Sequence, residues 1–421
     1  MIKIIKQKTY NFLRESERYT KTDMVYLFKG GSWLTLGQIV SSICSFLLAI
    51  AFANLLPKET YGSYRYVLSI AGLLAIPTLS GINTAIVQAV ARGYEGSFIK
   101  GLKTKIRWGL LGGLASLILS SYYYFNDNIT LTFAFLITGI FIPFMDSFNI
   151  YGALLIGKKK FKISTIYNII IKILSFIIII SVLFITNNIF LIIFTYFLSN
   201  TLLRLLFLFV TIKKIKINRK EDSETIPYGK HLSLIDIISI IASQLDKILV
   251  FHYLGAIELA IYAFAIAIPE QIKSLLKNMS TLALPKFSEK SIEKIKKTIF
   301  KKMAWMSLFI ALGTVFYIIA APYIYKLFFP QYIESIFYSQ LFSISLIAAI
   351  TILPTSALQA KIAKKELYKL NIYSPIIQIV LLFFFIYFYG ILGAIIARVL
   401  GRFIGLVISY WLFKKFKLKS I

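Results

Sequence analysis

Long apolar runs, separated by short polar segments, dominate the chain. Residues 163–185, for example, are interrupted only by Asn168, Lys172 and a few small polar side chains. An apolar run of about 18 residues or more is long enough to cross a bilayer as a helix. Because such runs recur from one end of the chain to the other, the pattern predicts an all-α polytopic membrane protein.

The apolar pattern predicts about twelve transmembrane helices. The boundary between the last two depends on a single residue, Gly390, in a very short turn. The expected limits are 31–55, 64–90, 108–125, 131–156, 163–185, 189–212, 232–254, 258–282, 303–328, 337–359, 370–389 and 391–413.

The charges of the loops support this count. Alternate loops are strongly basic, whereas the opposite loops carry only Lys58, Lys326 and, at a helix start, Arg65. Lys and Arg mark cytoplasmic loops, so both termini are expected in the cytoplasm. The same rule accounts for the net charge of +29 without nucleic acid as a partner. The basic set is Arg92, Lys100, Lys103, Lys105, Arg107, Lys158, Lys159, Lys160, Lys162, Lys213, Lys214, Lys216, Arg219, Lys220, Lys230, the stretch 273–302, Lys361, Lys364, Lys365, Lys369, Lys414, Lys415, Lys417 and Lys419.

An internal similarity predicts two repeats. Residues 52–64 align with residues 250–262 without a gap, matching at Leu56/Leu254 and Tyr64/Tyr262. An even number of spans separates the two segments, which predicts two parallel six-helix lobes. The expected units are a basic cytoplasmic segment 1–30, an N-terminal lobe 31–212, a linker 213–230, a C-terminal lobe 231–413 and a basic tail 414–421.

The residues that usually carry enzyme chemistry are scarce. Cys44 is the only cysteine and lies in the first predicted span, and the chain has two histidines, His231 and His252. Neither a GxxxxGK[ST] phosphate loop nor a GxSxG elbow occurs. We therefore expect neither an enzyme nor a metal or cofactor site.

Charged residues inside the predicted spans are the main candidates for function. A charge in the bilayer core costs about 2.5–3.5 kcal/mol and is usually retained for a function. We expect the cations to line a cavity between the lobes and to bind pyrophosphate, and the acids to couple transport to protons or sodium. The cations are Arg402, Arg398, Arg204, Lys247 and Lys172, and the acids are Asp246, Glu270 and Asp146.

Two alternatives remain open for these charges: they neutralise one another, or their long side chains reach back to the membrane surface. Arg402 is nearest the middle of a span, and it shares a helix face with Arg398, four residues away. Asp246 and Lys247 are adjacent, so we do not expect them to pair with each other. Glu270 follows Pro269 and could pair with Lys273, one turn further on.

Three segments resemble a known family. Residues 55–64, residues 81–92, and residues 243–250 with Gly255 and Tyr262 resemble polysaccharide biosynthesis flippases, the Wzx-type O-antigen transporters of the multidrug/oligosaccharidyl-lipid/polysaccharide exporter superfamily. The resemblance implies a MATE-like fold, with the two lobes around a central cavity. It implies a substrate, an undecaprenyl-pyrophosphate-linked O-antigen or capsule repeat unit, moved to the outer leaflet of the bacterial inner membrane by alternating access. It also implies contact with membrane lipids and other polysaccharide-assembly proteins.

Other classes fit less well. An ion-coupled multidrug or metabolite antiporter of the same fold should carry an acid in the first span, but residues 31–55 have none. A peptidoglycan-precursor flippase should carry arginines in its first two spans, where Arg65 is the only candidate. A membrane polymerase or ligase should have a large outside loop, and none is expected. Lys58, a lone charge in an outside turn, is expected to be solvated and dispensable.

Overall fold

The computed structural model describes residues 24–277, 287, 291–361 and 363–416. That part of the chain is almost entirely helical and contains no strand. Eight of its helices are long and apolar enough to cross a membrane, or nine if a bent pair counts as one span. The protein is therefore a multi-pass membrane protein, as the sequence predicted.

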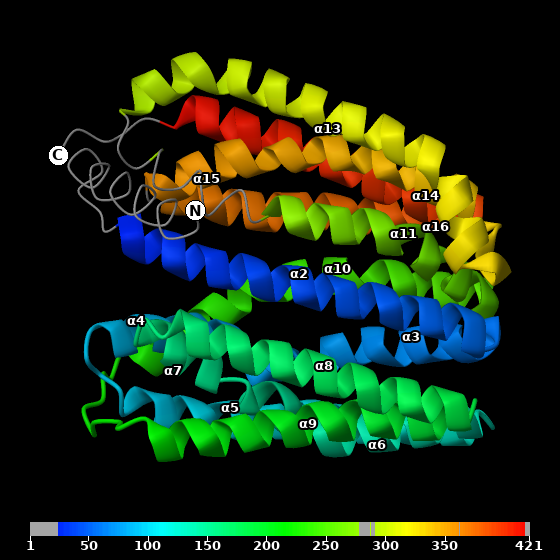
Figure 1. The fold of residues 1–421 in the computed structure, drawn as a ribbon, viewed down its shortest axis with the longest axis horizontal. Coiled ribbons are helices and arrows are strands. Elements are labelled where there is room, and N and C mark those ends of the chain that lie inside the picture. Colours follow the sequence, from blue (N-terminus) through cyan, green and yellow to red (C-terminus); the bar gives the residue numbers. More distant parts are fainter. Residues whose placement is uncertain (1–23, 278–286, 288–290, 362, 417–421) are drawn as a thin grey trace, which may run out of the picture.

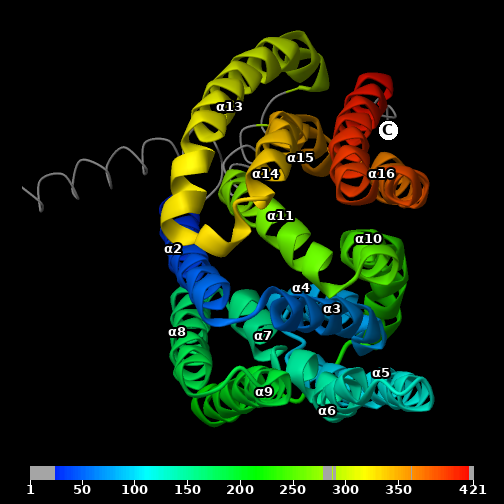
Figure 2. The same cartoon turned by 90° about the vertical axis from the view of Figure 1, so that its right-hand side faces the viewer.

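The first half of the chain forms one lobe, which we call the N-lobe (Figures 1 and 2). Its elements make six helical passes. Two of the passes are interrupted: one by the short η1 (Ile76–Thr78), the other between α6 and α7. The helices are α2 (Met24–Leu55), α3 (Lys58–Leu74) with α4 (Gly81–Ala91), α5 (Ser97–Phe125), α6 (Ile129–Phe148) with α7 (Tyr151–Gly157), α8 (Phe161–Ile185) and α9 (Ile189–Lys214).

The second half forms the C-lobe, again with six passes among the described residues (Figure 2). Its last helix is two spans joined at Gly390, whose φ of 54° and ψ of −131° break the helix where the sequence predicted a turn. The elements are α10 (Thr225–Leu254), α11 (Ala256–Lys277), α13 (Ile292–Phe328), η2 (Pro330–Tyr332), α14 (Ser335–Ser343) with η3 (Ile344–Thr351) and α15 (Ile352–Ala360), and α16 (Lys364–Lys415). The predicted fold of two six-helix lobes is confirmed.

Several predicted limits were wrong at the polar ends of helices. Helix α5 begins at Ser97, not at residue 108, and α13 begins at Ile292, not at residue 303. Lys and Arg are good helix formers, so a helix continues past the apolar stretch that marks its membrane core. Lys105, assigned to a loop, consequently lies inside α5. Much of the basic stretch 273–302 falls outside the described residues.

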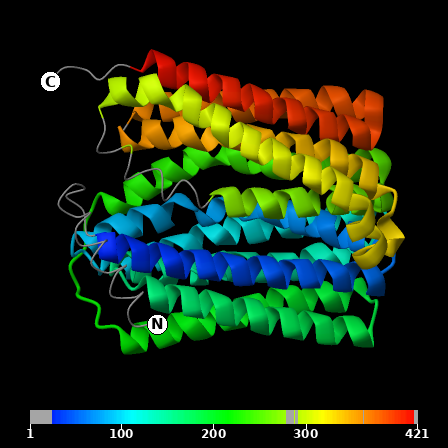
Figure 3. The ribbon, with the colours of Figure 1, turned by 45° about the horizontal axis from the view of Figure 1, so that its top comes forward.

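The helices run between two ends of different character (Figures 1 and 3). We call one the basic end; it carries the connections α4–α5, α7–α8 and α9–α10, and it lies on the left in Figure 1. The far end carries the turns near Pro57, Gly255 and Gly390. This arrangement matches the alternation of loop charge along the sequence.

The hydrophobic cores are arranged differently at the two ends. One hydrophobic core lies toward the far end and takes buried side chains from both lobes, including Tyr61 and Phe264. Toward the basic end each lobe has its own core: Phe98 belongs to that of the N-lobe, and Met303 to that of the C-lobe. The lobes are therefore sealed together at the far end and packed separately at the basic end.

Close contacts between the lobes occur at the far end. Lys58 pairs with Glu334 at 3.1 Å, and the Asn54 amide donates to the carbonyl of Phe328 at 3.0 Å. A Cβ added to Gly62 would lie 1.8 Å from the carbonyl oxygen of Ala256, so only glycine permits this approach of α3 to α11. The expectation that Lys58 is a lone solvated charge was wrong, because the fold brings an acid from the other lobe to it.

One seam continues to the basic end along α4 and α10. The backbone N–H of Gly81 donates to the Ser233 hydroxyl at 3.0 Å, and a Cβ on Gly81 would meet the backbone of Gly229 at 2.6 Å. The linker between the lobes then attaches to the N-lobe, where Arg92 pairs with Asp222 at 2.7 Å. On another side the Gln38 amide of α2 donates to the Ser274 hydroxyl of α11 at 3.3 Å, so the lobes also touch there although their basic ends have separate cores.

Candidate functional site

Five of the charged residues predicted for the site meet in the C-lobe. Arg398 on α16 pairs with Asp246 on α10 at 2.7 Å and with Glu270 on α11 at 2.5 Å. Arg402, one turn further along α16, also pairs with Glu270. Because the two arginines are four residues apart, they lie on one helix face and reach the same carboxylate oxygen, Oε1 of Glu270.

Asp246 is the deepest member of this cluster. Its side chain is fully buried and accepts hydrogen bonds from the Tyr262 hydroxyl at 2.6 Å and from the backbone N–H of Lys247 at 2.8 Å, besides its ion pair with Arg398. The Lys247 ammonium lies 3.8 Å from the same carboxylate. The expectation that Asp246 and Lys247 do not pair was therefore wrong. The closer ion-pair partner of Asp246 is nevertheless Arg398, which lies on another helix.

The arginines are also held by residues of α14 and η3. Arg402 donates to the Ser345 hydroxyl at 2.7 Å. The guanidinium carbons of Arg398 and Arg402 lie 5.0 and 4.6 Å from the centroid of the Phe342 ring. A guanidinium over an aromatic face gains electrostatic attraction. These contacts fix both arginines at one point of the C-lobe.

A second polar cluster lies in the N-lobe. Asp146 on α6 pairs with Lys105 on α5 at 3.0 Å and accepts from the Thr78 hydroxyl at 2.8 Å. Thr78 belongs to η1, where the second pass is broken, and the left-handed Leu79 (φ 59°) follows it. Arg204 on α9 donates to the carbonyl of Met145, next to Asp146, at 2.8 Å. The break in the second pass thus brings the Thr78 hydroxyl to the Asp146 carboxylate inside the N-lobe.

Besides Arg204, which donates to a backbone carbonyl, three cations lie outside these close ion pairs. Lys172 is exposed on α8 and carries a charge that interacts with Arg204. Among the described residues the buried Nε of Arg65 on α3 has no hydrogen-bond partner, and the charge of Arg65 acts on Lys247 on α10 of the other lobe. The Lys247 ammonium is held by the carbonyl of Ser243 and the Gln244 side chain, both at 3.0 Å. Positive charge therefore exceeds negative charge where α3 of the N-lobe meets α10 of the C-lobe.

Residues 27–291, well over half of the chain, match the sequence profile of a family described as "Polysaccharide biosynthesis protein". The chain belongs to this polysaccharide biosynthesis protein family. No curated protein matches the chain in sequence. The resemblance noted in residues 55–64, 81–92 and 243–250 lies within the matched range and is confirmed at the level of the family.

Solved structures extend the likeness over nearly the whole chain. The lipid II flippase MurJ in an inward closed conformation aligns with a TM-score of 0.70 at 18% identity, covering 91% of this chain and 87% of that one. A multidrug resistance MATE family transporter in an inward-facing conformation gives 0.67 at 13% identity, covering 90% and 94%. A MOP superfamily transporter from Pyrococcus furiosus, described as having a binding pocket of reverse polarity, gives 0.56 at 13% identity, covering 92% and 95%. At these identities the likeness establishes the fold alone: the chain has the same fold as these three transporters.

In this polysaccharide biosynthesis protein the predicted site residues are divided between the lobes. Arg398, Arg402, Asp246, Glu270 and Lys247 form one cluster in the C-lobe. Asp146 and Arg204 belong to the N-lobe cluster, and Lys172 lies apart on α8. Within the described residues no three His, Cys, Asp or Glu side chains are grouped so as to hold a metal ion.

Sequence reasoning missed the uncharged partners of these clusters and three further residues in or near them. Lys105 was assigned to a loop, Tyr262 was noted only for its place in the repeat, and Arg65 was taken for the start of a helix at the outer surface. A signal existed for Lys105, since Gly101 and Gly109 lie one turn to each side of it and let neighbouring helices approach closely. Tyr262 gave no comparable signal, because its partner Asp246 lies on a different helix.

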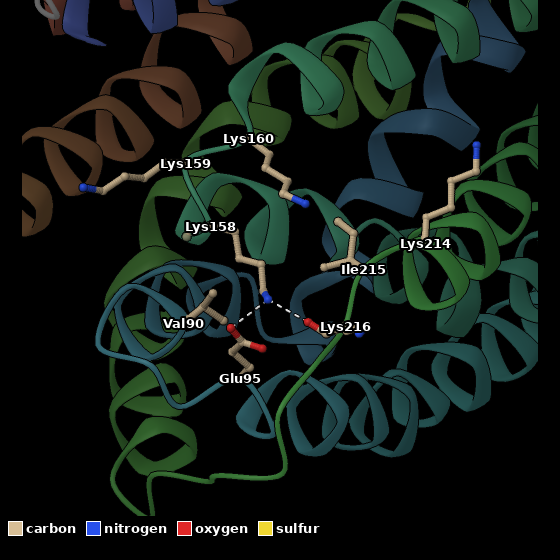
Figure 4. A pocket seen from close by; sticks show the side chains of 9 residues that line it. Val90, Glu95, Lys158, Lys159, Lys160, Lys214, Ile215 and Lys216 are labelled. Atoms are coloured by element: carbon tan, nitrogen blue, oxygen red, sulfur yellow. Dashed lines mark hydrogen bonds and ion pairs between the residues drawn. The ribbon is translucent and has the colours of Figure 1, made fainter.

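A separate groove of about 610 Å³ opens at the basic end of the N-lobe (Figure 4). Lysines from the α7–α8 connection and from the end of α9 dominate its lining, and Lys158 pairs with Glu95 at 2.7 Å. Burial alone would raise the pKa of Glu95, but hydrogen bonds from Lys158 and from the backbone of Asn218 outweigh it and hold that pKa below its usual value. None of the residues that line the groove belongs to the C-lobe cluster, and its lysines follow the loop-charge pattern of the sequence.

Proposed function

We propose that the protein is a flippase that moves an undecaprenyl-pyrophosphate-linked oligosaccharide, an O-antigen or capsule repeat unit, from the cytoplasmic to the outer leaflet of the bacterial inner membrane. Membership of the polysaccharide biosynthesis family and the MOP-superfamily fold support a membrane transporter of this kind. The substrate, the direction and the membrane are the parts that we propose.

The observation that carries the proposal is the excess of positive charge on the buried helices. In the C-lobe cluster, three cations (Lys247, Arg398 and Arg402) face two carboxylates. Arg65 adds a guanidinium whose Nε lacks a partner. A guanidinium presents a planar fork that binds phosphate oxygens in pairs, so such a set favours a diphosphate and disfavours a cationic drug.

The geometry of the lobes supports access from one side. They share a core at the far end and have separate cores at the basic end. If the basic end faces the cytoplasm, as the positive-inside rule indicates, this conformation admits a substrate from the cytoplasmic side. Transport then requires the far end to open and the basic end to close.

The test is deletion of the gene in its host. We expect surface polysaccharide to be lost and lipid-linked oligosaccharide to accumulate on the cytoplasmic leaflet. Complementation with Arg402→Ala should fail to restore export although the protein inserts normally, and complementation with Lys103→Ala, an exposed lysine of α5, should succeed. Unchanged surface polysaccharide after deletion would contradict the flippase proposal and favour the ion-coupled antiporter of the same fold.

A further inference from the structure

The acids of the C-lobe cluster differ in how firmly they are held. Asp246 is fully buried, and its oxygens are engaged by Arg398, the Tyr262 hydroxyl and the backbone of Lys247. The side chain of Glu270 is 32% exposed, and its second oxygen has only a loose contact, 3.9 Å from the Lys273 ammonium. Asp246 is therefore a fixed counter-ion, whereas Glu270 lies at the accessible edge of the cluster.

One oxygen of Glu270 receives both arginines. The Nη2 atoms of Arg398 and Arg402 converge on Oε1, while the remaining Nη1 atoms are directed to Asp246 and Ser345. Two guanidinium groups aimed at one point are the arrangement by which proteins hold a phosphate. A carboxylate has two oxygens and one charge, so it satisfies such a pair less fully than a diphosphate does.

We propose that Glu270 is a built-in occupant of the Arg398–Arg402 anion site and that the diphosphate of the substrate displaces it. This inference rests on the proposed function, because it explains what pairs with the same two arginines before the substrate binds. Without substrate, the Glu270 carboxylate neutralises the two arginines and so lowers the free energy of the folded protein, because a buried charge without a partner is strongly destabilising. The substrate binds by exchange, and its apparent affinity is lowered by the fraction of arginine pairs that Glu270 occupies.

Displacement of Glu270 can affect the contact between the lobes, because Glu270 lies on a helix that also packs on the N-lobe. Glu270 lies on α11 directly after Pro269, which removes a backbone donor and weakens the helix at that point. The other half of α11 packs on the N-lobe, where the Phe264 ring lies 4.7 Å from the Tyr61 ring. Release of Glu270 therefore removes the ion pairs that tie the basic half of α11 to α16, and leaves that half held to the N-lobe by the hydrogen bond from the Gln38 amide to the Ser274 hydroxyl at 3.3 Å.

The test measures binding of inorganic pyrophosphate to the purified full-length protein by calorimetry. Glu270→Gln removes the competing charge and is expected to tighten binding at least tenfold relative to wild type. Glu258→Gln, a neutralised acid on the same helix near the far end, should bind as wild type does. The tightening should disappear in the double variant Glu270→Gln/Arg402→Ala, which lacks half of the site.

The thermal unfolding temperature, measured with and without pyrophosphate, shows whether each variant is folded and whether it binds pyrophosphate. Without pyrophosphate, Glu270→Gln should unfold at a lower temperature than wild type, and pyrophosphate should raise that temperature more than it does in wild type. If Glu270→Gln does not fold, Glu270→Asp is measured instead. The shorter aspartate side chain reaches the arginines less well, so this variant should bind pyrophosphate more tightly than wild type does.

The outcomes separate the two proposals. Binding by wild type that is unchanged or weakened in Glu270→Gln and Glu270→Asp would overturn the displacement of Glu270 and leave the flippase proposal standing. Absence of pyrophosphate binding in wild type and in every Glu270 variant would contradict the anion site itself, and with it the proposed substrate. Tighter binding that persists without Arg402 would place the anion elsewhere and would also overturn the inference.

Discussion

Buried charges in this protein are mostly paired within their own lobe. Lys105 is completely buried and pairs with Asp146, while Arg398 and Arg402 share Glu270. The alternative that the intramembrane charges neutralise one another therefore holds for these residues. A pair of this kind contributes little net stability when intact, but breaking it strands a charge away from water.

Replacement of Lys105 by methionine should destabilise the N-lobe. The change leaves Asp146 with the Thr78 hydroxyl as its remaining close partner; because the Asp146 side chain is 33% exposed, the loss should be smaller than the roughly 3–5 kcal/mol of breaking a fully buried pair. The measurement is the thermal unfolding temperature in detergent. Lys103→Met, an exposed site on the same helix, serves as the control, and Lys105→Met/Asp146→Asn should recover part of the loss. A Lys105→Met protein as stable as wild type would mean that the pair is not buried as described.

At the scale of elements, breaks in the helices place the polar groups. The interruption at residues 76–80 presents Thr78 to Asp146, and Pro269 precedes Glu270. Gly390 turns one long apolar stretch into two antiparallel spans of α16, which brings Arg398 and Arg402 back beside α10 and α11. These breaks depend on residues with special backbone freedom or restriction.

Gly390→Ala should lower stability by about 1–3 kcal/mol, because its φ of 54° and ψ of −131° fall in a region that side chains avoid. Gly313→Ala is the matched control: that glycine is helical in α13, and an added Cβ meets nothing within 4 Å. The control should be neutral or slightly stabilising, since alanine favours helices by about 1 kcal/mol. Equal unfolding temperatures for the two variants would argue against a required turn at Gly390.

At the scale of the whole molecule, the lobes meet through a buried core at the far end and hold separate cores at the basic end. In the alternating-access cycle that we propose, the contacts at the far end have to break. The ion pair between Lys58 and Glu334 is exposed, so by itself it contributes at most about 1 kcal/mol. The aromatic contacts of Tyr61 and the close approach at Gly62 are the larger obstacles to opening.

A cross-link across the far end should stop transport. In a Cys44→Ser background, Lys58→Cys and Glu334→Cys are expected to react with a short bifunctional maleimide, because the native side chains meet at 3.1 Å. Export should fall to the level of the deletion strain, while either single cysteine leaves it unchanged after the same treatment. Full export by the cross-linked protein would show that the far end does not open during the cycle.

Gly62→Ala should hold the lobes apart at the same end, since its Cβ would lie 1.8 Å from the Ala256 carbonyl oxygen. We expect a lower yield of the Lys58→Cys/Glu334→Cys cross-link in this background. Gly31→Ala on α2 is the control, because a Cβ there meets nothing within 4 Å. An undiminished yield with Gly62→Ala would mean that α3 and α11 do not approach as closely as the structure has them.

The sequence by itself determined the fold class, the order of the passes and the division into two lobes. Each of these depends on properties local to a segment: an apolar run sets a span, loop lysines set the alternation, and Gly390 sets a turn. The polar ends of helices were placed less well, as the early start of α5 and the burial of Lys105 show. A lysine near the end of an apolar run has the same local pattern whether it faces water or an acid on another helix.

Only the tertiary structure decided which charges pair and which do not. Asp246, Glu270 and Arg398 are separated by up to 152 residues along the chain, and nothing in their local sequence indicates that they meet. The same holds for Lys58 with Glu334, which the sequence presented as a lone charge in a turn. An ion pair depends on the distance between two helices, and that distance is set by the packing of all the others.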